Sequence, residues 1–190
     1  MTKTIEALIK FIPNPVLEKD PNSSFTYRSK VLLSLVIISL ISTFCITIFI
    51  SFIEISGLID TGRHSVEEIF KNKNSSNLKI FLIAVVGAPL IEELIFRAPL
   101  TLFKNPKYFK YAFYGFTLVF GYLHIFNYQD FNTSILIFSP ILIAPQLVVG
   151  LYLGFIRIKF GLLWSIALHA IYNGILMSLF LLVKDAITQV

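Results

Sequence analysis

Two adjacent glutamates and an arginine lie in an otherwise apolar stretch, APLIEELIFRAPL, between Ala88 and Leu100. Ionisable groups in such surroundings are costly and count as functional candidates. Glu93 and Arg97 are four residues apart, which on a helix favours an ion pair with the acidic residue first. A purely structural pair would explain these two but not Glu92, which is turned about 100° from Glu93. A carboxylate left facing a polar cavity has the character of a general base.

Two histidines and an asparagine occur in other apolar stretches. His124 ends FGYLH, one helical turn after Phe120, and His169 ends LWSIALH, one turn before Asn173. Taken singly, each histidine is explained by a satisfied position inside a helix bundle, and His169 with Asn173 by a hydrogen bond between helices. Three such groups in three separate segments favour a shared site instead.

The elements that would position these residues are membrane helices. The hydrophobic fraction is 56% and the charged fraction only 14%, far from the average of soluble domains. A spanning helix needs about 20 mostly apolar residues, and the sequence offers five windows of roughly that length. We therefore expect an all-α, polytopic bundle with spans at Val31–Ile53, Ile80–Phe103, Tyr111–Gln129, Phe131–Ile156 and Phe160–Val183.

The chain divides into a short N-terminal segment, residues 1–30, and a single bundle, residues 31–190. In the first segment four apolar residues share one helical face before two prolines, which predicts a short helix lying on the membrane surface. A frayed terminus is the alternative. The four residues are Ile5, Leu8, Ile9 and Ile12.

Charge sets the expected orientation and partners. With five spans, ten lysines and arginines fall on the side of residues 1–30, 104–110 and 157–159, and five fall on the opposite side. This bias predicts an integral protein of the cell (plasma) membrane with a cytoplasmic N-terminus. The net charge of +5 is explained by anionic lipid, so no nucleic-acid partner is expected.

Depth permits the candidate residues to meet. At 1.5 Å per residue from the expected cytoplasmic ends, Glu92 and His169 lie roughly 15 Å deep and His124 roughly 20 Å. Helix tilt and uncertain ends shift each depth by several ångströms. Convergence in one cavity is therefore allowed by the sequence but is not demonstrated by it.

These motifs resemble those of a known protease family. Glu92 to Arg97 reads EExxxR, Phe120 to His124 reads FxxxH, and His169 to Asn173 reads HxxxN, in this order in separate apolar segments. The joint pattern, within residues 88–174, is similar to that of the CPBP (CAAX protease and bacteriocin-processing, or Abi) intramembrane proteases, which are related to the type 2 CAAX prenyl endopeptidases.

The resemblance implies an activity and a role for each candidate. A membrane-embedded cavity would hold a water activated by Glu92 and His124, which attacks a peptide bond of a membrane-associated peptide or protein. His169 and Asn173 would stabilise the oxyanion, and Glu93 with Arg97 would support the site. CAAX endopeptidases with known prenyl substrates often have more helices, so five spans suit a minimal catalytic core.

Two questions stay open at this stage. Glu92, His124 and His169 would make a His2Glu set for a divalent metal such as zinc, although HExxH is absent, and a metal-free, glutamate-activated water suits the same residues. The function also has alternatives in a non-catalytic scaffold or bacteriocin-immunity protein of the same family and in a proton-coupled transporter. The absence of an inverted repeat argues against the transporter.

Overall fold

The computed structural model describes residues 1–59, 61, 76–129 and 132–188, with side chains as far as residue 183. Within these ranges the backbone forms helices and no β-strand, so the all-α prediction is confirmed. The elements are α1 (Thr2–Phe11), α2 (Phe25–Ile55), α4 (Asn77–Leu82), the π-helical η1 (Ile83–Gly87), α5 (Ala88–Phe96), the 3-10 helix η2 (Ala98–Leu102), α6 (Pro106–Leu123), the 3-10 helix η3 (His124–Asn127), α7 (Thr133–Leu142), α8 (Ala144–Phe160) and α9 (Leu162–Thr188).

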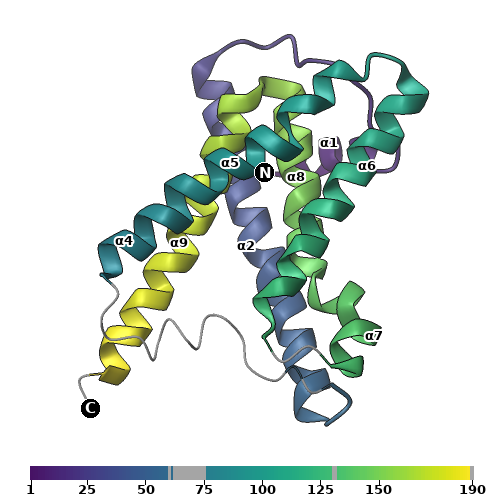
Figure 1. The fold of residues 1–190 in the computed structure, drawn as a ribbon. Coiled ribbons are helices and arrows are strands. Elements are labelled where there is room, and N and C mark those ends of the chain that lie inside the picture. Colours follow the sequence, from purple (N-terminus) through teal and green to yellow (C-terminus); the bar gives the residue numbers. More distant parts are fainter. Residues whose placement is uncertain (60, 62–75, 130–131, 189–190) are drawn as a thin grey trace.

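The long helices run up and down the molecule. Figure 1 shows α2, the α4–α5 segment, α6, α8 and α9 in alternating directions, so that the connections from α5 to α6 and from α8 to α9 lie together at its upper end. Among the described residues three stretches are long and apolar enough to cross a membrane: Phe25–Ile55, Thr133–Phe160 and Leu162–Val183.

The predicted count of five spans is therefore not confirmed. The window Ile80–Phe103 is divided among α4, η1, α5 and η2, none of which reaches spanning length by itself. The window Tyr111–Gln129 lies in α6 and η3, and the first two turns of α6 carry Lys107 and Lys110. Both windows are helical as expected, but neither is among the stretches long and apolar enough to be a candidate span.

The window Phe131–Ile156, predicted as one span, contains a break. α7 ends at Leu142 and α8 begins at Ala144, with Ile143 at φ −93° and ψ 1° between them. Pro145 explains the break, because it has no N–H to donate and its ring clashes with the preceding turn. The backbone therefore continues as two helices joined at one residue.

A proline also shapes the segment that carries the glutamates. Pro89 cannot continue the α-helical hydrogen bonds of α4, and the N–H of Ala88 bonds to the carbonyl of Ile83, five residues back. The Ala84 carbonyl thus loses its α-helical donor to Ile83, and its π-helical donor would be Pro89, which has none. It accepts instead from Nδ2 of Asn173 in α9 at 2.9 Å.

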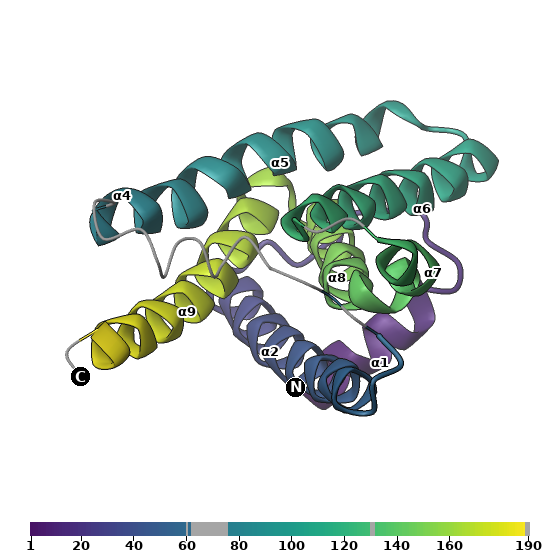
Figure 2. The same cartoon turned by 60° about the horizontal axis from the view of Figure 1, so that its bottom comes forward.

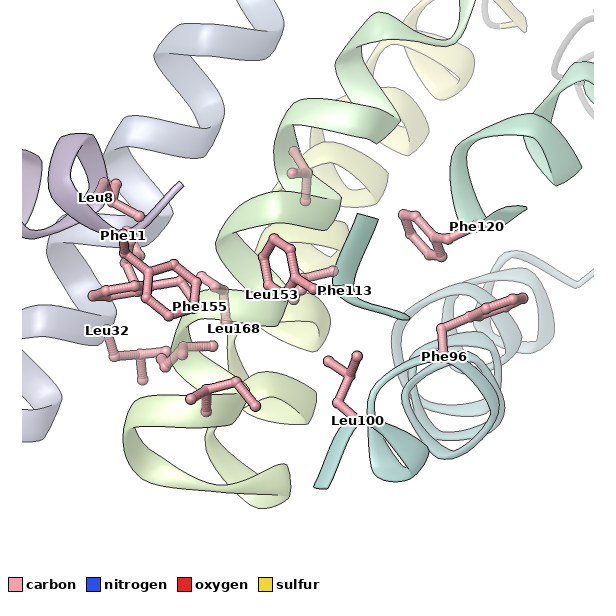
Figure 3. Packing of buried hydrophobic residues seen from close by; sticks show 14 of the residues in the cluster. Leu8, Phe11, Leu32, Phe96, Leu100, Phe113, Phe120, Leu153, Phe155 and Leu168 are labelled. Atoms are coloured by element: carbon pink, nitrogen blue, oxygen red, sulfur yellow. The ribbon is translucent and has the colours of Figure 1, made fainter. Parts of the chain in front are cut away.

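α8 is the central helix of the bundle and packs against α2, α6 and α9. Its fully buried Leu153 and Ile156 belong to one apolar cluster with Phe113 of α6 and Leu168 of α9. Figure 3 shows Phe113 beside Leu153, with Phe155 facing α1 and α2. Small residues allow this close approach, as is common between membrane helices.

The N-terminal helix is part of this bundle. α1 forms as predicted, but it turns Leu8 and Phe11 into the core, while Ile5 and Ile9 remain exposed. The ring of Phe11 makes an edge contact with Phe155, their centroids 5.2 Å apart. The predicted apolar face is therefore rotated, because contact with α2 and α8 decides which side is buried.

The α6–α8 contact yields a stability prediction. A Cβ added to Gly154 would lie 2.5 Å from Cε2 of Phe113, whose side chain is fully buried. Gly154→Ala should therefore lower the free energy of unfolding by about 1–3 kcal/mol, measured by SDS titration in mixed micelles. The matched control is Gly115→Ala in α6, where a Cβ meets nothing within 4 Å. That change should stabilise the helix by up to about 1 kcal/mol, and equal effects of the two variants would contradict the prediction.

Candidate active site

α5 and α9 bring together three of the predicted residues. Nδ1 of His169 donates to Oε1 of Glu93 at 3.0 Å, and Nε2 of the same ring lies 3.6 Å from Oε2 of Glu92. The first distance is a hydrogen bond and the second is longer than one. The imidazole therefore stands between two carboxylates, one on each ring nitrogen. This places Glu92, Glu93 and His169 in one site.

The two glutamates lie in different environments. Glu93 is fully buried, and its Oε2 has no hydrogen-bond partner among the described residues. The side chain of Glu92 is 27% exposed, but its Oε2, the oxygen nearest His169, is buried and has no hydrogen-bond partner among the described residues. A buried carboxylate bonded to a ring nitrogen, as Glu93 is, orients that ring. The two glutamates thus differ in exposure and in their bond to the imidazole.

The ion pair predicted for Glu93 and Arg97 is not present among the described residues, although both side chains are buried. Arg97 is the last residue before η2, with φ −115°, and its guanidinium lies over the Phe120 ring, 4.3 Å from the centroid. Its Nη2 donates to the Gly150 carbonyl at 3.4 Å. Glu93 bonds to His169 of another helix and not to Arg97, which helical spacing predicted as its partner.

Arg157 of α8 binds the backbone at the end of α5. The sequence reasoning did not select this residue. Its Nε donates to the Arg97 carbonyl at 2.9 Å and its Nη2 to the Ala98 carbonyl at 3.3 Å. The Arg97 carbonyl also accepts from the Leu100 N–H and the Ala98 carbonyl from the Thr101 hydroxyl. Arg157 thus adds a second donor to each carbonyl and joins the start of η2 to α8. The sequence signal was weak, because Arg157 looked like one of several loop cations.

Two uncharged residues of α8 were also missed. A Cβ at Gly150 would lie 3.2 Å from Arg97 Nη2 and from the Phe120 ring, so a side chain there would press on both groups by a few tenths of an ångström. Gln146 lies one turn earlier on the same helix, and its Oε1 is buried without a hydrogen-bond partner in the described part of the chain. An amide in the apolar run APQLVV is a signal that the sequence carries.

His124 adjoins the group through an aromatic ring. Its Nδ1 lies 2.9 Å from the Phe120 carbonyl, and because a carbonyl only accepts, Nδ1 carries the hydrogen and Nε2 is the basic nitrogen. The Phe120 ring contacts both histidines, with its centroid 5.0 Å from that of His124 and 5.9 Å from that of His169. His124 is therefore near the site, separated from His169 by Phe120.

Asn173 lies on α9 one turn beyond His169, as its spacing predicts, but its amide is engaged elsewhere. Nδ2 donates to the Ala84 carbonyl of η1, the carbonyl that Pro89 leaves without a backbone donor. This bond gives Asn173 a structural task that the sequence did not indicate. One N–H of its amide remains for another acceptor.

The predicted zinc ligands do not converge on one point. His169 directs one ring nitrogen to Glu93 and the other to Glu92, while His124 lies beyond the Phe120 ring. Within residues 1–59, 61, 76–129 and 132–183 no three His, Cys, Asp or Glu side chains are grouped to hold a metal ion. The donors in this arrangement thus do not fit a three-ligand zinc centre.

Comparisons with known proteins agree with the motifs. The family model described as type II CAAX prenyl endopeptidase Rce1-like matches residues 74–175, more than half of the chain and the whole of the site. No curated protein and no solved structure matches the chain significantly. A partly exposed glutamate beside an oriented imidazole, inside an apolar bundle with the motifs EExxxR, FxxxH and HxxxN, is consistent with the family match. The chain belongs to the Rce1-like family of type II CAAX prenyl endopeptidases.

Proposed function

We propose that this protein is an intramembrane endopeptidase that hydrolyses a peptide bond of a membrane-associated peptide or protein. The observation that carries the proposal is the partly exposed side chain of Glu92, whose Oε2 lies unpartnered 3.6 Å from Nε2 of an imidazole that buried Glu93 holds by its other nitrogen. A general base needs access to water and a fixed neighbour. Family membership supports proteolysis as the reaction.

In the proposed reaction Glu92 takes a proton from a water, and the oxygen of that water attacks the carbonyl carbon of the scissile bond. The C–N bond then breaks, and the proton held by Glu92 passes to the leaving amine. His124 assists from its basic Nε2, since Nδ1 is occupied by the Phe120 carbonyl. Each of these proton transfers is of the kind that a positioned side chain accelerates.

Stabilisation of the oxyanion falls to His169 and Asn173 in this proposal. As an imidazolium, His169 donates from Nε2 while Glu93 retains Nδ1–H, and the adjacent carboxylates balance the positive charge. Asn173 contributes the amide hydrogen that the Ala84 carbonyl does not use. Donors fixed in advance toward a developing negative charge are the largest single source of catalysis in many enzymes.

The proposal includes a membrane setting. We propose five membrane passes, a cytoplasmic N-terminus and a location in the plasma membrane. In this orientation the upper end of the bundle in Figure 1 faces anionic lipid, as the bias of lysine and arginine favours. The many large apolar side chains exposed on α2, α5 and α9 support contact with a bilayer. The substrate would then reach the site from within or beside the membrane.

The proposed peptidase function is tested by comparing the wild type with a His124 variant. Wild type and His124→Ala would be reconstituted in liposomes with a panel of membrane-anchored peptides, with and without a chelator, and products identified by mass spectrometry. We expect wild-type cleavage and a decrease of about 10²-fold or more in the variant. Cleavage that survives the chelator would support the metal-free reaction, and chelator-sensitive cleavage would restore the zinc prediction. No wild-type cleavage of any peptide would favour the scaffold or immunity function.

A further inference from the structure

A pocket lies between α1, α2 and α8, on the opposite side of the bundle core from the candidate active site. It has a volume of about 370 Å³ and is lined by residues of all three helices and of the segment between α1 and α2. Figure 2 shows α1 lying across α2 and beside α8. None of the candidate catalytic residues lines this pocket.

Three lysines from three different helices line this pocket: Lys3 of α1, Lys30 of α2 and Lys159 of α8. Like charges held together repel one another. Within the described residues the only carboxylate within ion-pair distance of any of them is Glu18, at 3.8 Å from Lys159, and Glu18 is itself 75% exposed. The three lysines thus outnumber the carboxylates beside them, and the pocket has an excess of positive charge.

The acidic residue of the lining offsets one of the three lysine charges but forms no ion pair with them. Asp20 accepts from the Asn22 N–H through Oδ1, at 2.8 Å, and from the Tyr27 hydroxyl through Oδ2, at 2.9 Å. Both oxygens are therefore used by neutral donors that shape the turn before α2. The carboxylate organises the pocket wall and leaves the ammonium groups available.

A hydroxyl adds a donor to the same pocket. Thr4 lines it, and the residue as a whole is only 6% exposed. Hydroxyl and ammonium groups both donate to phosphate oxygens, so this lining suits an anionic oxygen ligand.

Val31, Phe155 and Phe160 form an apolar part of the remaining wall, which also includes Met1, Ala7, Tyr27 and Ser34. Basic pockets between membrane helices are sites for lipid headgroups, and an apolar wall beside the charges suits the glycerol and the first acyl carbons. We propose that this pocket binds the phosphate headgroup of an anionic phospholipid. The lipid would tie α1 to α2 and α8.

The chain offers a built-in reporter for the test. Trp164 is its single tryptophan, and its ring lies 5.9 Å from that of Phe160 in the pocket wall. Delipidated protein in neutral detergent would be titrated with short-chain phosphatidylglycerol while Trp164 fluorescence is recorded. Short-chain phosphatidylcholine supplies a phosphate without net charge, and glycerol phosphate supplies the anion without acyl chains.

We expect saturable binding of phosphatidylglycerol, weaker binding of the other two probes, and a loss of affinity of about a hundredfold in the triple variant Lys3→Gln, Lys30→Gln, Lys159→Gln. The matched control removes three lysines at the same end of the bundle but outside the pocket, Lys104, Lys107 and Lys110, and should leave the affinity unchanged. Circular dichroism checks that both variants are folded. Equal affinity in the two variants, or equal binding of the two lipids, would overturn the proposal, and binding of glycerol phosphate as tight as that of phosphatidylglycerol would exclude a lipid ligand.

Discussion

Glu92→Gln is expected to reduce peptide hydrolysis by about 10³-fold, within the range for loss of a general base, while the protein keeps its fold. Glutamine preserves the size of the side chain, but its amide cannot accept a proton from water. Because Glu92 is partly exposed and makes no hydrogen bond that supports the bundle, its replacement should cost little stability. Turnover is measured with the liposome assay and stability by SDS titration.

Two further variants sharpen this expectation. Glu92→Asp keeps the carboxylate but withdraws it by one methylene, so it should retain more activity than Glu92→Gln. Glu18→Gln changes a carboxylate far from the site that is 75% exposed, and it should behave like wild type. If Glu92→Gln cleaved as fast as the wild type, Glu92 could not be the base, and the proposed mechanism would be wrong.

The second large effect is expected in stability, from the buried charges of α5. Glu93 and Arg97 are not paired, but they are both almost completely buried, one turn apart. Arg97→Met removes one of the cations that act on the Glu93 carboxylate, leaving Arg157, and removes the contact with the Phe120 ring. Breaking a directly paired buried set of charges costs about 3–5 kcal/mol, so for these unpaired residues we expect a smaller loss, up to about 3 kcal/mol.

A double-mutant cycle separates this electrostatic effect from lost packing. Glu93→Gln removes the second charge, and the variant carrying both changes should be more stable than the sum of the single losses predicts, by about 1 kcal/mol or more. The free energies of unfolding come from SDS titrations of the four proteins. Strict additivity would mean that the two side chains do not interact, and Arg97 would then act through packing alone.

Much of the fold follows from the sequence because apolar windows and helical spacing are local properties. The windows located helices, and Pro89 and Pro145 were visible from the start. What the windows could not show is how the backbone accommodates each proline: at Pro145 the helix ends, whereas at Pro89 it continues through a π-turn because Asn173 supplies a donor from another helix. The partner that decides between the two outcomes lies 84 residues further along the chain.

The candidate site shows the same division. Residue type and spacing selected Glu92, Glu93 and His169, which the bundle brings together. Spacing also predicted that Glu93 would pair with Arg97. This prediction was wrong, because Glu93 bonds instead to His169 of another helix. The side chain of Arg97 instead depends on the ring of Phe120 and on the space left by Gly150, neither of which carries a charge that would attract notice in a sequence.

The two bonds between α5 and α9 have a mechanical consequence. Glu93 with His169, and Ala84 with Asn173, join the α4–α5 segment to α9 at two points, about 14 Å apart along the α4–α5 segment and about 6 Å apart along α9. Separating the helices would leave a carboxylate and a carbonyl unpaired in apolar surroundings, which is costly at both points. In the proposed reaction we therefore expect these helices to move together, and a peptide to enter where they meet α2 or α6.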